Sequence, residues 1–439
     1  MASPPRWRAV TLVALVLSLG ALVHARAQAP PGAAAGAPAA ALAQAEIAPV
    51  FQQLAALRGM AAPGPPPPAV MRSRAETRRY VEGELARRYS PARIEAERKS
   101  MVAWGLIPAD YDLRQLFVDL LEEQVSAYYD PVARTMVLGD WLAPGERQVA
   151  LLHELVHALQ DRDVALDAFL APLPGQGDRV LARQALVEGE AVAMMLDVLM
   201  RRMGADLASL PDVGAIRSQI AASSLGPVIE RAPRFLRDLL LFPYVDGLTF
   251  VHQWRRRNQW SAIGALYRDP PRSSAQILHP DKFLGPRQDP LVVALPDLAP
   301  HTAGLTLVIE DEMGEFGLAG ALGVHLGEAA GRRTALGWRG DRFRVCEEAP
   351  GRFAIAAVIA MDTEASAAAL AQALPDIVER RHPGAARRPG AGPVIAWRDG
   401  ARALAVERRG PVVLLLEQVP EASADAMREA IWRARPALP

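Results

Sequence analysis

The stretch that decides the fold of this chain is LLHELVHALQDRD, residues 151–163. It places His153, Glu154 and His157 in a segment whose other positions, over residues 149–159, are all Val, Ala or Leu. A helix that is apolar nearly all round is normally buried. Burying two imidazoles and a carboxylate without partners costs several kcal/mol. We therefore expect a buried helix whose polar side chains bind a metal ion.

The spacing of these three polar residues suits zinc. His153 and His157 are four residues apart, so they lie on one face of a helix. Two imidazole nitrogens placed there can bind one Zn²⁺ at about 2.0–2.1 Å. Glu154 can reach a water at the metal without ligating it, which is what a general base needs. This is the HExxH pattern. The alternative interpretation is two satisfied core histidines beside a helical glutamate.

A zinc site of this kind needs a third protein ligand. Residues 158–167 contain neither the glycine nor the third histidine of the longer HExxHxxGxxH pattern. The stretch QALVEGEAVAMMLDVLM, residues 184–200, predicts a second buried helix that carries Glu188 and Glu190. Because these two glutamates point to nearly opposite sides, only one can face the metal. The alternative for either is a salt bridge with Arg179, Arg183 or Arg201.

HELVH followed by a helix with VEGEA resembles the gluzincin branch of the zincin metallopeptidases. In that branch two histidines and a downstream glutamate hold zinc, and the motif glutamate activates water. The resemblance implies that His153, His157 and a glutamate are ligands and that Glu154 is the base. Glu188 is followed by Gly189, and this pair is similar to the aminopeptidase-like members, whose ligand glutamate is followed by glycine. The resemblance implies Glu188 rather than Glu190 as the ligand. The gap from His157 to Glu188 is longer than in the best-known gluzincins, which leaves the subfamily open.

Other segments carry a second resemblance. The chain is similar to uncharacterised secreted bacterial proteins described as metallopeptidases, through AYYDPVARTMVL (127–138), FPYVDG (242–247) and YRDPPRSSAQILHPDKF (267–283). This resemblance implies a reaction class and no substrate.

Gly189 lies between the two glutamates, where a helical glycine costs about 1 kcal/mol relative to Ala. We expect it to allow close packing against the histidine helix.

Composition limits the remaining possibilities. A length of 439 residues suggests two or three domains, and the half of the residues that are apolar can build a large core. The net charge of zero argues against a nucleic acid or an acidic membrane as an electrostatically bound partner. Cys346 is the single cysteine, so the chain has no internal disulfide and no cysteine-based metal site.

Residues 1–27 have the pattern of a secretory signal peptide. Arg6 and Arg8 precede an apolar run over residues 9–23, and residues 25–27 form an A-x-A cleavage site. The run, about 15 residues long, is shorter than the roughly 20 needed to span a bilayer. We expect export to the periplasm or the extracellular space, with no stable membrane span after cleavage. An uncleaved membrane anchor is the alternative.

The mature chain begins with an Ala/Pro/Gly-rich segment, residues 28–71, which is predicted to be a linker with a short helix over 47–57. Helical spacing follows over residues 72–121. Two β-rich runs around Asp130 and Pro131 predict a hairpin. In zincins a strand beside the cleft can pair with an extended substrate, and this hairpin is the candidate. A plain structural hairpin is the alternative.

Further helices are expected over residues 213–223, 228–241 and 245–257. Three side chains in this part of the chain could donate a hydrogen bond to the oxygen of a scissile carbonyl: Tyr244, His252 and His279. A partly buried tyrosine or a loop histidine is the alternative for each of them.

No metal-binding pattern appears from Asp289 onward. Residues 304–322 predict a strand and then a helix, and a further helix is expected over 365–381. Apolar or alternating runs predict strands over residues 341–348, 352–362, 403–410 and 412–419. His301, His325 and His382 are scattered and expected to be structural.

Together these patterns predict an α+β protein. A mainly helical, zincin-like domain with a small β-hairpin covers residues 72–288, and an α+β region of undefined role covers 289–439. The expected activity is zinc-dependent hydrolysis of a peptide or protein substrate outside the cytoplasm. The competing interpretations are a non-catalytic zincin-fold binding protein with a structural metal and a zinc hydrolase of a non-peptide bond. Glu154 favours catalysis, because a structural site has no need of a base there.

Overall fold

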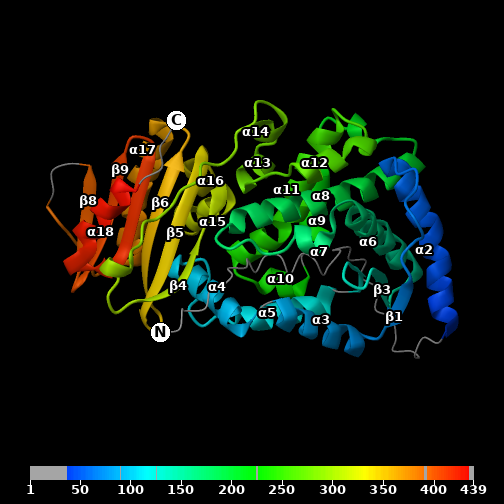
Figure 1. The fold of residues 1–439 in the computed structure, drawn as a ribbon, viewed down its shortest axis with the longest axis horizontal. Coiled ribbons are helices and arrows are strands. Elements are labelled where there is room, and N and C mark those ends of the chain that lie inside the picture. The colour runs from blue at the N-terminus through cyan, green and yellow to red at the C-terminus, as the bar shows by residue number, and fades with distance from the viewer. Residues whose placement is uncertain (1–36, 89, 125, 224–225, 390–392, 435–439) are drawn as a thin grey trace.

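The first two thirds of the chain fold mainly into helices, and the last third forms an antiparallel sheet (Figure 1). The computed structural model describes residues 37–88, 90–124, 126–223, 226–389 and 393–434. Helix makes up 55% of the described residues and strand 18%, which confirms the predicted α+β class. The predicted signal peptide, residues 1–27, lies outside the described residues. In the described ranges, no helix combines the length and the apolar character needed to cross a membrane.

The two helices predicted to meet at the metal pack against each other. Helix α6 (Pro144–Val164) contains the HExxH pattern, and α8 (Gly177–Arg202) contains both glutamates. Pro144 suits the first turn of α6, where a missing N–H removes no helical hydrogen bond. The side chain of Glu146 accepts a hydrogen bond from the N–H of Ala143 and so caps the same end. Both helices are longer than predicted, and the predicted ranges lie inside them.

Helix α11 (Arg234–Arg255) packs along α8. The sequence predicted two helices, over 228–241 and 245–257, but α11 is continuous through Pro243. The packing partner of Gly189 also differs from the prediction. A Cβ on Gly189 would lie only 2.3 Å from the carbonyl of Gly247, so its close contact is with α11 and not with the histidine helix. This contact brings α11 against the face of α8 that carries Ala185 and Gly189.

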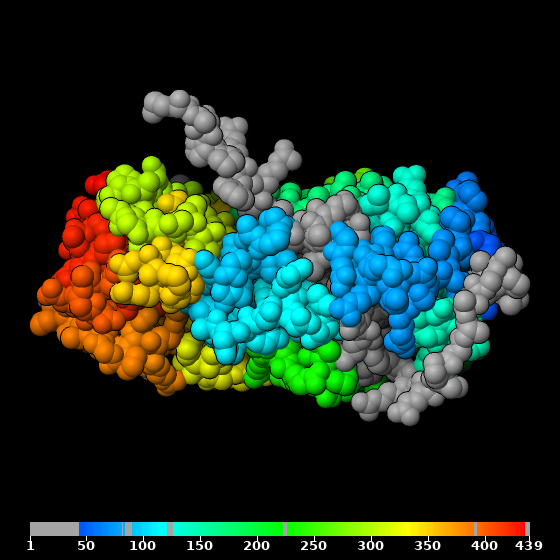
Figure 2. Space-filling view, turned by 90° about the horizontal axis from the view of Figure 1, so that it is seen from below, coloured from blue at the N-terminus to red at the C-terminus, as the bar shows by residue number. Residues whose placement is uncertain are grey.

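The other helical elements surround this pair. Figure 2 shows α3 to α5, in blue and cyan, forming one side of the molecule between the C-terminal sheet and the N-terminal helix. The remaining helices of this part are α2 (Ala37–Arg58), α3 (Arg74–Arg88), α4 (Pro91–Ala103), α5 (Leu113–Gln124), α7 (Leu166–Phe169), α9 (Gly214–Ser223), α10 (Pro227–Arg231), α12 (Gly264–Arg268), α13 (Ser274–Leu278) and α14 (Asp281–Leu284).

A three-stranded sheet lies beside α6. Its order is β1 (Ala69–Arg72), β3 (Thr135–Gly139) and β2 (Ala127–Asp130). Strands β2 and β3 are antiparallel, which confirms the predicted hairpin around Asp130. Strand β1 joins β3 in parallel. Because β3 is central, β2 is an edge strand of this sheet.

The segment predicted to be a linker contributes more to the fold than expected. In place of a short helix over residues 47–57, it forms the 22-residue helix α2, which packs on α6 and places Ile47, Phe51 and Leu54 fully in the core. Strand β1 follows it. The predicted start of the folded domain at residue 72 therefore lies too late in the chain.

The C-terminal part is a seven-stranded antiparallel sheet in the order β4-β5-β6-β10-β9-β8-β7. Its two faces bury alternate residues, against helix α17 on one side and α18 on the other. The predicted strand and helix of residues 304–322, the four further predicted strands and the helix over 365–381 are confirmed, whereas β7, β8, α16 and α18 were not predicted. The elements are β4 (Thr306–Asp311), α15 (Gly314–Leu326), α16 (Glu328–Ala335), β5 (Trp338–Ala349), β6 (Arg352–Met361), α17 (Glu364–Arg381), β7 (Ala386–Arg387), β8 (Val394–Asp399), β9 (Arg402–Arg409), β10 (Val412–Pro420) and α18 (Glu421–Arg433).

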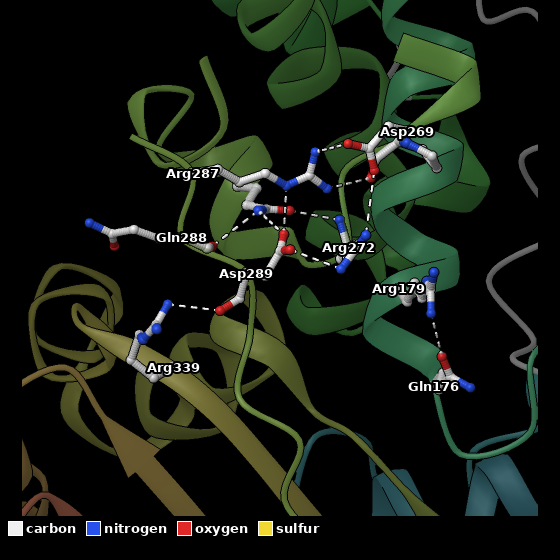
Figure 3. A network of polar contacts seen from close by, with 10 residues as sticks. Gln176, Arg179, Asp269, Arg272, Arg287, Gln288, Asp289 and Arg339 are labelled. Atoms are coloured by element: carbon white, nitrogen blue, oxygen red, sulfur yellow. Dashed lines mark hydrogen bonds and ion pairs between the residues drawn. The ribbon is translucent and has the colours of Figure 1, made fainter. Parts of the chain in front are cut away.

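Asp289 joins the two parts of the molecule (Figure 3). Its carboxylate accepts hydrogen bonds from Arg272 (2.8 Å) and Arg287 (2.7 Å) of the helical part. Its backbone oxygen accepts one from Arg339 of β5 at 2.8 Å. The predicted boundary between residues 288 and 289 therefore falls in an ion-paired junction, and one hydrophobic core continues across it.

Glu312, at the same junction, makes stability depend on pH. Burial raises its pKa to about 7, and the neighbouring carboxylate of Asp341 adds to the shift. Because this pKa lies above that of an unfolded glutamate, the folded protein binds more protons over the window between them. The stabilising contribution of Glu312 is therefore lost as pH rises from about 4.5 to 7. We expect Glu312→Gln to stabilise the protein at pH 8 by on the order of 1–3 kcal/mol, with little effect at pH 4.5.

Urea unfolding at both pH values measures this difference. Glu429→Gln, which changes an exposed glutamate on α18, is the matched control and should give similar small effects at both. Equal effects of Glu312→Gln at pH 4.5 and pH 8 would contradict the prediction.

Candidate metal centre

Three side chains from α6 and α8 converge on one point. The Nε2 atoms of His153 and His157 are 3.2 Å apart. The Oε2 atom of Glu188 lies 3.2 Å from the first of these nitrogens and 3.6 Å from the second. Among the described residues, these three form the one group of His, Cys, Asp or Glu side chains whose ligand atoms lie close enough together to hold a metal ion.

The triangle of donor atoms has the size that zinc requires. Tetrahedral ligands at about 2.0–2.1 Å from a zinc ion lie about 3.3 Å from one another. The observed separations of 3.2, 3.2 and 3.6 Å match that value. Two imidazoles and one carboxylate are also a donor set that zinc accepts in catalytic sites, where a fourth position stays open. The residues therefore fit zinc.

Glu188 and His157 stabilise each other's charged forms. Burial alone lowers the pKa of His157, but the carboxylate of Glu188 outweighs it and raises the pKa to about 9. Burial in turn raises the pKa of Glu188, and the two histidines outweigh it, so the pKa ends below its usual value. His153 and Glu188 are both 2% exposed, so little water screens these interactions.

Glu154 faces the edge strand β2. Its Oε2 atom accepts a hydrogen bond of 2.9 Å from the N–H of Tyr129. This N–H points away from β3, so the outer edge of β2, a strand whose four residues are all buried, lies next to the carboxylate. Burial is the main cause that raises the pKa of Glu154, and the charge of Glu188 adds to it. A carboxylate with a raised pKa next to a metal site is suited to accept and return a proton.

Tyr244 is the one candidate donor that the structure brings to this site. Its ring centre lies 6.3 Å from that of His153, with an angle of 30° between the two planes. Burial raises the pKa of Tyr244 well above its usual value, and the nearby charges of Glu188 and Glu154 add to the shift. Its hydroxyl therefore stays protonated and can donate a hydrogen bond.

The other two candidate donors lie elsewhere. His252 lies near the backbone of Leu207 and Leu210, and its buried Nε2 atom makes no hydrogen bond among the described contacts. His279 contacts the carboxylate of Glu315 on α15 at 2.5 Å. Neither belongs to the group of ligand atoms at the candidate zinc site. The structural interpretation is therefore the better one for both histidines.

Glu190 takes a different role from Glu188. It is fully buried and pairs with Arg58, whose Nε atom donates to Glu190 Oε1 at 2.8 Å. The hydroxyl of Tyr267 and the amide of Gln160 donate to its other oxygen. A salt bridge was the predicted alternative for this glutamate, but the expected partners were arginines 179, 183 and 201. The actual partner comes from the segment predicted to be a linker.

Gln160 is the residue near the site that the sequence interpretation passed over. It follows His157 by three residues and closes the apolar run, so it lies on the same helix face. That position was the signal that could have identified it. Its Oε1 atom contacts His157 Nδ1 at 2.8 Å.

Comparison with known proteins adds one finding. Residues 306–428 match a family described as a domain of unknown function (DUF8575). The match covers the C-terminal sheet and its helices, so every residue of the candidate metal centre lies outside it. No curated protein and no solved structure matches the chain.

Proposed function

We propose that this protein is a zinc-dependent metallopeptidase of the gluzincin type. The observation that carries the proposal is the triangle of donor atoms from His153, His157 and Glu188, with Glu154 directly beside it. A buried carboxylate at this position has no role in holding the metal, whereas hydrolysis needs a base there. Catalysis is therefore a better explanation of Glu154 than a structural metal.

Each side chain has a distinct task in this proposal. A zinc ion held by the three ligands would supply Lewis-acid chemistry, by making a water acidic and by polarising the scissile carbonyl. Glu154 accepts the proton of the attacking water and delivers it to the leaving amine. Tyr244 donates a hydrogen bond to the carbonyl oxygen as negative charge develops on it.

The edge strand supports a peptide as the substrate. Peptides bind to exposed strand edges through main-chain hydrogen bonds. Strand β2 is buried and its Tyr129 N–H is held by Glu154, so a peptide would pair with the edge that does not face β3 by taking the place of that contact. An extended chain paired with β2 would therefore pass the base and the zinc ligands.

The proposed place of action is outside the cytoplasm. The charged, apolar and A-x-A segments of residues 1–27 support this, because they match a cleaved export signal. The mature enzyme would then work in the periplasm or the extracellular space.

The test is hydrolysis of a broad peptide library by the zinc-loaded protein, with products identified by mass spectrometry. We expect cleavage that stops when a chelator removes zinc and returns when zinc is added back. A library of peptides with blocked and free termini would also separate endopeptidase from exopeptidase action. A zinc-loaded protein that cleaves none of these peptides would overturn the proposal in favour of a binding protein or a hydrolase of another bond.

Tyr244→Phe removes a single hydroxyl group from the site. We expect kcat to fall by about 10²–10³-fold, the loss typical of one oxyanion donor, with KM and zinc affinity little changed. His279→Gln is the control, because His279 contacts Glu315 and not the zinc ligands. Steady-state kinetics on one cleaved peptide measures both variants. Normal kcat in Tyr244→Phe would remove this residue from the mechanism.

A further inference from the structure

We propose that Gln160, Glu190 and Arg58 form a positioning network that holds the proton of His157 on Nδ1 and aims Nε2 at the metal. The network makes the N-terminal helix α2 part of the metal centre. This inference rests on the proposed zinc site and concerns residues that do not touch the ion.

The orientation of the Gln160 amide is fixed by its partners. Its Nε2 atom donates to the backbone oxygen of Val187 at 3.0 Å and to Glu190 Oε2 at 2.9 Å. Both partners can only accept hydrogen bonds, so the NH₂ group must face them. The amide oxygen then faces Nδ1 of His157 at 2.8 Å.

This orientation decides which nitrogen of His157 carries the proton in the neutral ring that a metal requires. The oxygen of Gln160 can only accept, so Nδ1 must be the donor. A neutral imidazole protonated on Nδ1 has its lone pair on Nε2. That atom lies 3.2 Å from His153 Nε2, at the point where the metal ligands meet. Gln160 therefore acts on the metal through His157.

Glu190 prevents the amide from turning over. A flipped Gln160 would place its oxygen against a carboxylate and a carbonyl in a site closed to bulk solvent, since Gln160 and Glu190 are both 0% exposed. Buried acceptors left without donors cost about 1–3 kcal/mol each. The carboxylate of Glu190 thus selects the orientation that presents an acceptor to His157.

Arg58 supplies the positive charge that pairs with Glu190 in the core. Its Nε atom donates to Glu190 at 2.8 Å, and another nitrogen of its side chain pairs with Asp163 of α6. Arg58 is the last residue of α2, so this one side chain ties the helix to both metal helices. Breaking such a buried pair leaves an uncompensated charge. Helix α2 is therefore a support of the site and not a removable cover.

Gln160→Leu tests the network. We expect zinc affinity, measured by competition with a chelator, to fall by about 10–100-fold, as is typical when a supporting partner of a ligand is lost. In the zinc-loaded protein, the Nδ1 proton of His157 should exchange slowly with water in the wild type and rapidly in the variant, as followed by ¹H–¹⁵N NMR. A merely structural role of Gln160 would leave that exchange unchanged.

The chain offers a matched control. Gln184 is also buried on α8, one turn before Glu188, and its amide makes no hydrogen bond among the described contacts. Gln184→Leu should therefore leave zinc affinity and the His157 proton as in the wild type. An equal loss of affinity in Gln184→Leu and Gln160→Leu would overturn the proposal.

A double variant covers the case in which Gln160→Leu does not fold. Gln160→Glu with Glu190→Gln exchanges the amide and the carboxylate, so His157 keeps an acceptor and the network keeps its charge, while the carbonyl of Val187 loses its donor. We expect zinc binding weaker than wild type by less than about tenfold. If the double variant folds but loses zinc to the extent expected for Gln160→Leu, the network is refuted. If the wild-type protein binds no zinc, the proposed function fails, whereas wild-type affinity in Gln160→Leu defeats only the network.

Discussion

Peptide hydrolysis should fall by about 10²–10⁴-fold in Glu154→Gln, while the protein keeps its zinc and its melting temperature. The substitution removes the base but keeps the length of the side chain and an oxygen that can accept the hydrogen bond from Tyr129 N–H. Loss of the base affects the proton transfer and leaves the three ligand atoms in place. Rates on a cleaved peptide, zinc content and a thermal melt together measure the effect.

Glu407→Gln is the matched control for that variant. Glu407 is buried on β9, where it pairs with Arg409 and Arg428, far along the chain from the candidate site. The Glu407→Gln variant should hydrolyse peptides at the wild-type rate even if its stability falls. If Glu154→Gln also retained the wild-type rate, the chemistry would have to lie elsewhere in the protein.

Glu188→Gln should weaken zinc binding by at least about 10²-fold. Zinc sites of four ligands bind with about 10–16 kcal/mol, so each ligand contributes roughly 3 kcal/mol, or two orders of magnitude in affinity. Glu190→Gln makes the same change two residues further along α8 and removes no ligand. The loss of zinc affinity in Glu190→Gln should be smaller, because Glu190 acts only through Gln160 and His157.

Chelator competition on both variants decides between the two glutamates. A neutral amide at residue 188 leaves the two histidines without their anionic partner, which stands 3.2 and 3.6 Å from their Nε2 atoms. The reverse ranking, with Glu190→Gln releasing zinc more readily than Glu188→Gln, would show that the wrong carboxylate has been assigned.

Local patterns made much of the core of this fold predictable. The i and i+4 spacing of His153 and His157 already determines that they share a helix face, whatever lies around them. The turn residues around Asp130 likewise specify the hairpin, since its carboxylate accepts the N–H groups of Val132 and Ala133. Alternating apolar residues in the C-terminal strands match a sheet covered on both faces. Helix α18 was missed, although its apolar residues have helical spacing.

Contacts between distant parts of the chain could not be predicted in this way. Arg58 is 132 residues from Glu190, and nothing near either residue specifies the other. Pro243 normally ends a helix, but packing along α8 keeps α11 continuous across it. Gly189 signalled a close contact correctly, yet only the three-dimensional arrangement shows that the neighbour is Gly247. The pairing of the two histidines is thus a local feature, whereas the approach of Glu188 and the contacts behind the candidate site are tertiary ones.

The most direct test of the account is an anomalous difference map, collected at the zinc absorption edge, from crystals of the protein grown with zinc. We predict one strong peak within about 2.0–2.2 Å of His153 Nε2, His157 Nε2 and a carboxylate oxygen of Glu188. Glu154 should lie near the peak without ligating it, and Glu190 should remain paired with Arg58. A zinc-soaked crystal with no peak at these three residues, or with the zinc bound elsewhere, would contradict the account.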